Sequence, residues 1–276
     1  MDFYICKTCG TQYDQREEPP AHCPICEDDR QYIGFQGQEW ITLTGLQQGH
    51  QNIFRTLEPG LTGIATQPDF AIAQRALLVQ SPQGNLLWDC ISLIDDHTIS
   101  QVNALGGISS IAISHPHYYS AMVEWAKAFD VPIYLHSKNR RFVMRPDDHI
   151  VFWDGDLLEM GDGLRLIRCG GHFPGSAVLH WASGADGKGA LLSGDTVTVA
   201  LDRKFVSFMY SYPNLVPLAA STVKRIAAAI EPYSFEHVYG AWWSREILSD
   251  GKGAVKRSVD RYLAALEGRF GEQESD

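Results

Sequence analysis

The sequence has no apolar run close to the roughly 20 residues that a membrane-spanning helix requires. Positive charge is also scarce, because 23 Lys and Arg residues stand against 33 Asp and Glu, which gives a formal net charge of −10. An acidic surface repels phosphate backbones and anionic lipid headgroups. We therefore expect neither nucleic acid nor a membrane to be a partner of this chain.

The N-terminal residues lack the basic segment and apolar core of a secretory signal, so we expect none. Six cysteines without such a signal are more typical of metal ligands and buried thiols than of disulfides. We therefore expect a reducing, cytoplasmic setting. Hydrophobic residues make up 45% of the 276-residue chain, as in a folded protein. Only the polar tail at 271–276 is expected to be disordered.

Four of the six cysteines lie near the N-terminus in two pairs of the same spacing, Cys6-x-x-Cys9 and Cys23-x-x-Cys26. Two residues between cysteines allow a tight turn to direct both sulfurs at one ion, and two such turns complete a tetrahedral site. A segment of about 36 residues is too short for a sufficient apolar core, so metal binding would supply the missing stability. We predict a metal-binding ribbon at 1–36 and a main domain at 37–276.

The ribbon resembles the short rubredoxin-like segment found in some iron proteins. The matching residues are Tyr4-x-Cys6-x-x-Cys9-Gly10 and Pro20-x-x-Cys23-Pro24-x-Cys26. The resemblance implies one ion held by the four sulfurs. The spacing does not distinguish the metal: zinc would make the ribbon a structural or docking element, whereas iron would imply electron transfer. We favour Zn²⁺ and keep iron as the alternative.

Beyond a polar linker at 36–51, predicted strands alternate with predicted helices, an order typical of sheets covered by helices. Short apolar runs bounded by turn residues predict the strands, and a 3.6-residue periodicity predicts the helices. Ser120 is placed to cap the first of these helices. Strands are expected at 71–80, 85–89, 108–114, 131–135, 164–169, 177–181, 190–193 and 237–239, and helices at 121–129, 218–230 and 256–266.

Three segments with metal-ligand chemistry each follow a predicted strand. The first contains His115 and His117, which are two residues apart and can share one side of an extended segment. The second places His172 in a glycine-flanked loop, and the third ends a strand with Asp195 after Gly194. Neutral imidazoles with one carboxylate form a site suited to zinc or ferrous iron. The three histidines and the aspartate are therefore candidate metal ligands.

These segments resemble the metallo-β-lactamase superfamily over roughly 55–245. Its H-x-H-x-D-H motif is matched by His115 and His117, and its later loop histidine by His172 in Gly-His-x-Pro-Gly. Its strand-end aspartate is matched by Asp195 in Ser-Gly-Asp, and an aspartate behind the metal ligands by Asp89 in Leu-Leu-Trp-Asp. The resemblance implies an α/β protein with the αββα sandwich of the metallo-β-lactamase fold, whose metal site lies at one edge of two packed sheets.

Three positions depart from the superfamily pattern, and all three normally hold a second metal. Tyr119 stands where the motif has Asp, Ser120 where it has His, and Ala241 where the final His is placed. The resemblance therefore implies a single active-site ion, held by the three histidines, with Asp195 as a fourth ligand or a nearby base. Tyr119 is also a candidate catalytic residue. It and Tyr118 either donate hydrogen bonds to a developing oxyanion or pack over the site.

The preferred hypothesis is a mononuclear metal-dependent hydrolase with one Zn²⁺ in the active site and another in the ribbon. By the habit of the superfamily, the substrate would be a small molecule such as an ester or thioester, and the sequence identifies no substrate-binding residues. One alternative is an iron redox enzyme that uses His115, His172 and Asp195 as a two-histidine, one-carboxylate site. The other is a metal-binding or regulatory module that has lost catalysis. A homo-oligomer is compatible with the sequence.

Overall fold

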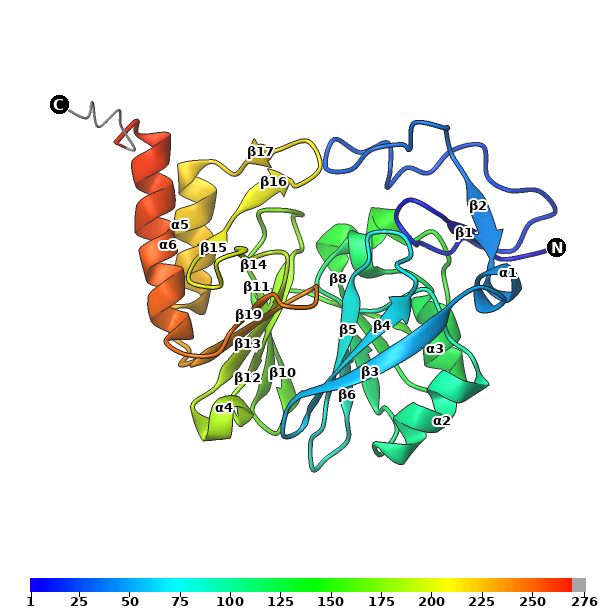
Figure 1. Cartoon of the computed structure of the whole chain (residues 1–276), viewed down its shortest axis with the longest axis horizontal. Helices are drawn as coiled ribbons and strands as arrows, with labels where there is room; N and C mark the ends of the chain where they lie inside the picture. The colour runs from blue at the N-terminus through cyan, green and yellow to red at the C-terminus, as the bar shows by residue number, and fades with distance from the viewer. Residues whose placement is uncertain (270–276) are drawn as a thin grey trace.

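Two β-sheets pack face to face in the computed structural model, which describes residues 1–269 (Figure 1). The predicted disordered tail and the end of the predicted main domain lie outside the described residues. The first sheet is antiparallel over its first four strands and parallel over its last four. In spatial order it contains β3 (Gln51–Glu58), β4 (Leu61–Gln67), β5 (Arg75–Val79), β6 (Leu86–Trp88), β7 (Ser110–Ala112), β8 (Ile133–His136) and β9 (Ile150–Trp153).

The second sheet is antiparallel except for one parallel pair, β13 with β18. In spatial order it contains β10 (Leu157–Gly161), β11 (Leu164–Arg168), β12 (Ala177–Trp181), β13 (Ala190–Gly194), β18 (His237–Gly240) and β19 (Glu246–Ile247). Every residue of β12 and β13 is buried, because these strands are covered on both faces. Their continuous apolar runs made both strands predictable from the sequence.

Helices cover the outer face of each sheet, which gives the predicted αββα sandwich (Figure 1). α2 (Asp96–Ala104) and α3 (Met122–Phe129) share an apolar core with the first sheet. α5 (Ala220–Ile230) and α6 (Gly251–Leu266) cover the second sheet. On α5 the buried side chains are Val223, Ile226 and Ile230, a spacing of three and four residues that places them on one face.

Shorter elements complete the chain. The ribbon contributes β1 (Tyr4–Cys6), which pairs with β2 (Trp40–Thr42). The helix α1 (Leu43–Gln47) follows β2 directly. The prediction of a linker at 36–51 was therefore wrong, because β2 and α1 occupy that stretch; the boundary after residue 36 stays a prediction. The remaining elements are η1 (Pro116–Tyr118), η2 (Ser137–Phe142), α4 (Gly184–Gly187), β14 (Thr198–Val199), β15 (Val206–Ser207), β16 (Met209–Ser211) and β17 (Val216–Pro217).

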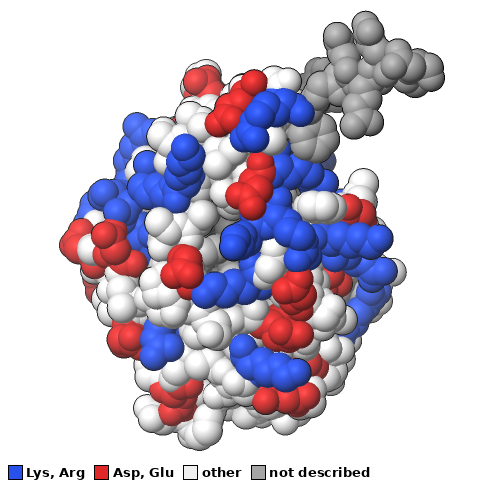
Figure 2. All heavy atoms as spheres, turned by 90° about the vertical axis from the view of Figure 1, so that its left-hand side faces the viewer, with Lys and Arg blue, Asp and Glu red and all other residues white. Residues whose placement is uncertain are grey.

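Basic side chains gather on the face formed by α5 and α6, although the protein is acidic overall (Figure 2). Acidic side chains lie among them and form ion pairs, such as Arg257 with Asp250 at 2.5 Å and Lys252 with Glu231 at 3.7 Å. The positive charge of this face is therefore partly neutralised. Among the described residues, none of the helices combines the length and the apolar character that crossing a membrane would take.

Candidate metal centres and active site

The four N-terminal cysteines converge on one point. Their sulfurs all lie within 4.8 Å of one another, and the side chains are buried. The Sγ atoms of Cys6 and Cys26 are 3.5 Å apart, and those of Cys9 and Cys23 are 3.7 Å apart. A disulfide would require about 2.05 Å, whereas a tetrahedron with Zn–S bonds of about 2.3 Å has sulfurs about 3.8 Å apart. All six cysteines are free, so the sulfur geometry fits a bound metal ion and not two disulfides.

A tight turn at Gly10 and side-chain donors surround Cys6. The Gly10 N–H donates a hydrogen bond of 2.8 Å to the Cys6 carbonyl oxygen, and Gly10 has a φ of +78° that favours glycine. The neighbouring cysteine thiols hydrogen-bond to Cys6 and lower the pKa of its thiol. Gln38 Nε2 donates a further hydrogen bond of 3.0 Å to Cys6 Sγ. The side-chain donors stabilise the Cys6 thiolate, which is the form that binds metals.

The three candidate histidines and Asp195 come from three segments at one edge of the two sheets. His115 follows β7 and precedes η1, where its extended backbone (φ −166°, ψ 173°) leads the chain into the turn that carries His117. His172 lies in the loop between β11 and β12, and Asp195 follows β13. Because β7 belongs to the first sheet and β11 to β13 belong to the second, the site joins the two sheets.

The donor atoms of these residues are close together and sequestered from solvent. The ring nitrogens that the three histidines direct at the site lie within 4.8 Å of one another. His115 Nε2 is in direct contact with Asp195 Oδ1. His172 Nε2 lies 3.2 Å from His117 Nδ1 and 3.9 Å from Asp195 Oδ2. None of the four residues is more than 3% exposed. The structure thus brings together all four residues that the sequence suggested, while their roles stay predictions.

The electrostatics of this cluster fit a divalent cation. Burial lowers the pKa of His117 well below its usual value and lowers that of His172 to about 4, so both rings are neutral at pH 7. His172 Nδ1 donates to the Tyr210 carbonyl oxygen over 2.8 Å, which leaves the Nε2 lone pair directed at the cluster. Burial raises the pKa of Asp195, but the neighbouring His115 and His172 outweigh burial and keep that pKa below its usual value. Neutral imidazoles with an ionised carboxylate are a suitable donor set for zinc or ferrous iron.

Asp89 and Gly194 fix the strand ends that lead into the histidine cluster. Asp89 follows β6, and its Oδ1 accepts a hydrogen bond of 2.8 Å from the Ser114 backbone N–H, next to His115. Burial raises the pKa of the Asp89 carboxyl to about 7. Gly194 has a φ of +55°, and a Cβ there would lie 3.0 Å from Ser114 Oγ and 3.3 Å from Asp89 Oδ2. The glycine of Ser-Gly-Asp therefore allows the end of β13 to approach the first sheet.

The residues that depart from the superfamily pattern, Tyr119, Ser120 and Ala241, add no metal-ligand atom to the histidine cluster. The Ala241 carbonyl oxygen accepts a hydrogen bond of 2.7 Å from the Arg75 backbone N–H. Ser120 does not cap α3, which has no side-chain cap; that prediction was wrong. Its Oγ instead donates to the Cys90 carbonyl oxygen over 3.3 Å and accepts from Gln74 Nε2 over 2.9 Å. Within residues 1–269, the four cysteines and the three histidines are the sets of three or more donor residues that converge.

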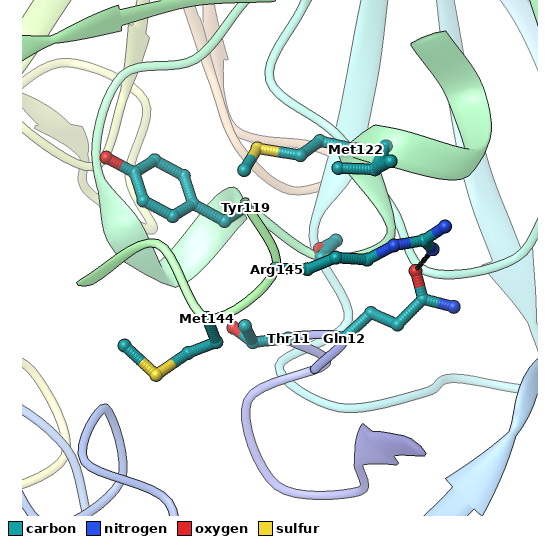
Figure 3. Close-up of a pocket in the computed structure, with 8 residues that line it drawn as sticks. Thr11, Gln12, Tyr119, Met122, Met144 and Arg145 are labelled. Carbon is teal, nitrogen blue, oxygen red and sulfur yellow. Dashed lines mark hydrogen bonds between the residues drawn. The ribbon is translucent and has the colours of Figure 1, made fainter. Parts of the chain in front are cut away.

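The adjacent tyrosines Tyr118 and Tyr119 take different positions. The Tyr118 ring centroid lies 4.4 Å from that of His115, and the Tyr118 hydroxyl is buried without a hydrogen-bond partner. Burial, and then the charge of Asp195, raise the pKa of Tyr118 well above its usual value. Tyr119 instead lines a pocket between the main domain and the ribbon (Figure 3). A catalytic role for Tyr119 stays a prediction, and Tyr118 is the tyrosine that neighbours both His115 and Asp195.

The ribbon contacts the main domain of its own chain around this pocket. Figure 3 shows the dashed hydrogen bond that Arg145 donates to Gln12 Oε1. Arg145 also pairs with Glu124 of α3 at 2.5 Å, and the Gln12 N–H donates to the Ser120 carbonyl oxygen over 2.9 Å. The pocket has a volume of about 10 Å³, close to the minimum for a single water molecule. The interface is therefore closely packed.

A second contact places the ribbon against the histidine cluster, and no sequence motif indicates it. Arg30 Nε donates a hydrogen bond of 2.6 Å to the carbonyl oxygen of His172. The guanidinium carbon lies 4.6 Å from the ring centroid of Phe173 and 4.5 Å from that of Tyr210. The two hydrogen-bonded residues are 142 positions apart in the chain. No local pattern marks such a contact, so only the fold reveals it.

The strand order, the two-sheet packing and the histidine cluster at the sheet edge define a protein of the metallo-β-lactamase fold with an N-terminal four-cysteine segment. The solved structure of VMB-1 is similar, with a TM-score of 0.59 and 16% identity, over 78% of this chain and 98% of that chain. The metallo-β-lactamase FIM-1 from Pseudomonas aeruginosa, in its mono-zinc form, has a TM-score of 0.57 and 14% identity, over 78% and 96%. At these identities the likeness shows the fold.

No protein-family model matches the sequence. One curated relative is 52% identical over 268 residues, which cover 96% of this chain and 97% of the relative. That relative is the uncharacterized protein YmaE of Bacillus subtilis (strain 168), and the chain belongs to the same family as YmaE. The name of this relative states no activity, so the histidine cluster itself is the basis for a functional proposal.

Proposed function

We propose that the protein is a mononuclear metal-dependent hydrolase whose active site is the histidine cluster with Asp195. The observation that carries the proposal is the convergence of three buried imidazoles beside an ionised carboxylate. Tyr119, Ser120 and Ala241 stand where the superfamily pattern places the ligands of a second metal, which supports a site with one ion. When bound, zinc would polarise the carbonyl or phosphoryl oxygen of a substrate and would acidify a water molecule at neutral pH.

Asp195 is the proposed base when it is not a metal ligand. Its lowered pKa keeps the carboxylate ionised at neutral pH, and its Oδ1 lies next to His115 Nε2. The Tyr212 hydroxyl donates a hydrogen bond of 2.6 Å to the backbone carbonyl oxygen of Asp195, which fixes the turn after β13. A carboxylate held in this way orients a water molecule for attack and accepts its proton.

Tyr118 is the proposed donor to the oxyanion that forms on the substrate. Its raised pKa keeps the hydroxyl protonated, and the hydroxyl has no hydrogen-bond partner among the described residues. A buried hydroxyl without a partner carries a desolvation penalty that a hydrogen bond to the oxyanion would relieve. Tyr119 is the alternative donor, because it belongs to the same turn. The variants Tyr118→Phe and Tyr119→Phe, assayed separately, would distinguish the two.

We propose one Zn²⁺ in each centre and keep iron as an alternative in either. Four thiolates at tetrahedral spacing suit both metals, as do imidazole and carboxylate donors. Iron held by the four cysteines would give visible iron–thiolate absorption bands, whereas zinc is colourless. Iron in the histidine cluster would favour the redox enzyme over the hydrolase.

We propose a small-molecule ester or thioester as the substrate, in a cytoplasmic protein. The net charge of −10 and the ion pairs on the basic face support a small molecule over nucleic acid or a membrane as the partner. Six free cysteines support a reducing compartment. A homo-oligomer is compatible with this proposal and is tested by the mass of the protein in solution.

The experiment combines metal analysis with hydrolysis assays on the full chain. Protein purified without added metal should hold two metal ions per chain and should hydrolyse generic esters or thioesters. His115→Ala should lose one ion and fall to the uncatalysed background. His97→Ala is the matched control, because His97 is exposed on α2, and it should behave like the wild type. Hydrolysis that survives the loss of the ion in His115→Ala would refute the mechanism.

The second candidate is a metal-binding module that has lost catalysis. The burial of all four cluster residues to 3% exposure or less, with the ribbon packed against His172, is the observation that favours it. This candidate predicts that the wild type holds both ions but hydrolyses no ester or thioester in the panel. Turnover that depends on His115 would rule it out.

A further inference from the structure

We propose that Arg30 of the ribbon is a positioning residue for the histidine cluster, so that metal binding there depends on the four-cysteine segment. The observation is that one ribbon side chain contacts the backbone of a cluster histidine and also the aromatic residues that flank it. The proposal rests on the metal-binding part of the proposed function. It does not depend on hydrolysis.

Arg30 holds the loop of His172 from two sides. Its Nε donates to the His172 carbonyl oxygen over 2.6 Å, and its guanidinium lies between the rings of Phe173 and Tyr210. The carbonyl oxygen of the same Tyr210 accepts the hydrogen bond from His172 Nδ1. Arg30 therefore contacts His172 directly and also contacts the residue that sets the orientation of its ring.

Phe173 extends the influence of Arg30 to the other two histidines. The Phe173 ring centroid is 5.5 Å from that of His115, in a stacked arrangement, and 4.9 Å from that of His117. Phe173 is fully buried, so its ring has little freedom to move away. A displacement of Arg30 would therefore be felt at all three imidazoles.

The cysteine pair of the ribbon places Arg30. The Glu27 N–H donates to the Cys23 carbonyl oxygen over 3.0 Å and closes a turn at this cysteine pair. The next turn, closed by the Gln31 N–H donating to the Asp28 carbonyl oxygen over 2.9 Å, carries Arg30. Arg30 Nη1 then pairs with Asp28 at 2.5 Å, and both side chains are less than 15% exposed. An ion pair this well buried fixes the guanidinium relative to the turn.

The main domain fastens the other side of the same turn. Ser211 Oγ donates to the Arg30 carbonyl oxygen over 3.2 Å. Asn214 Nδ2 donates to the carbonyl oxygens of Asp29 and Gln31 at 3.1 and 3.0 Å. Three consecutive ribbon carbonyls are therefore bound by the end of β16 and the loop that follows it. The ribbon turn cannot shift as a unit without breaking these hydrogen bonds.

The test measures metal affinity in the full chain loaded with Co²⁺, whose visible spectrum separates thiolate from imidazole coordination. Arg30→Met keeps the length of the side chain but removes its charge and donors. Arg30→Lys keeps the charge and a donor without the planar fork. Arg141→Met is the matched control, because Arg141 is 71% exposed and lies 4.0 Å from the same Asp28.

We expect the cluster of Arg30→Met to bind Co²⁺ about 10- to 100-fold more weakly than the wild type, as is typical when a residue that orients a metal ligand is lost. The thiolate bands of the ribbon should stay unchanged. Arg30→Lys should recover part of the affinity, and Arg141→Met should match the wild type. If Arg30→Met affects folding, Asn214→Leu replaces it: weaker binding at the cluster alone would support the proposal.

Two negative results have different meanings. Wild-type protein that binds Co²⁺ only through the cysteines would refute the metal site of the proposed function and this inference with it. A wild type that fills both centres, with Arg30→Met and Asn214→Leu equal to Arg141→Met within about twofold, would overturn this inference and leave the proposed function standing.

Discussion

Replacement of Arg75 by Met should destabilise the protein severely, because Arg75 is a fully buried cation with specific partners. Its side chain is 0% exposed, and its Nη1 pairs with Glu246 of β19 at 2.6 Å. Its Nε and Nη2 donate to the Gly240 carbonyl oxygen at 3.1 and 2.9 Å. Arg75→Met keeps most of the volume but leaves the Glu246 charge, which is 14% exposed, without its partner.

The magnitude follows from the loss of one partner of a buried ion pair, which costs about 3–5 kcal/mol in the free energy of unfolding. For a chain of this size, each kcal/mol shifts the melting temperature by roughly 2–4 °C. We therefore expect a decrease of roughly 6–20 °C. Thermal and guanidinium unfolding, followed by circular dichroism at fixed zinc concentration, would measure both quantities.

Arg55→Met is the control for this experiment. Arg55 is exposed on β3 and stacks on the same Trp243 ring as Arg75, at 4.5 Å against 5.1 Å. Loss of an exposed cation–π contact should cost only about 0.5–1 kcal/mol. If Arg75→Met lost no more stability than Arg55→Met, the buried ion pair would not be what holds β19 and the Gly240 turn to the first sheet.

Three further predictions concern the metal centres. Without metal, the free energy of unfolding should decrease as the pH falls, because the pKa of His172 is about 4 in the folded protein and about 6.5 in the unfolded chain. The stabilising contribution of the neutral His172 ring is fully present above pH 6.5, and about 3 kcal/mol of it is lost by pH 4. Denaturation of His172→Gln should lack this slope. Gly10→Ala should lose at least about 1–2 kcal/mol in the free energy of unfolding, because its φ of +78° is left-handed and a Cβ there would lie 2.7 Å from Ser92 Oγ. An unchanged free energy of unfolding in denaturant would contradict this prediction. Removal of metal by a chelator should expose the ribbon amides to hydrogen exchange and leave β4 and β5 protected; an equally protected ribbon would contradict it.

The sequence predicted β12 and β13, whose residues are all buried, but it did not predict β4, although the first five residues of β4 are buried. β12 has the predicted bounds and β13 extends one residue further, because continuous apolar runs bounded by turns leave few alternatives. β3 was not predicted, since its mixed exposure gives neither a buried run nor a regular alternation. α6 begins at Gly251, five residues before the predicted start. Its first turn was not predicted because the glycines at 251 and 253 disfavour a helix in isolation.

The candidate site was predictable where spacing and local turns carry the chemistry. The four cysteines and the His115-x-His117 pair are local patterns, and the fold brings them to their partners. The neighbours of the site were not predictable, because they arrive from distant parts of the chain. Tyr210 meets His172 across 38 positions and Arg30 meets it across 142, and neither residue lies in a motif.

The ribbon crosses from one half of the sandwich to the other, since Gln12 is bonded beside α3 and the 29–31 turn is bonded to the loop after β16 (Figure 1). Shear between the two sheets would have to break contacts at both ends of this crossing. The metal-loaded protein should therefore melt in one cooperative transition, with neither sheet opening ahead of the other.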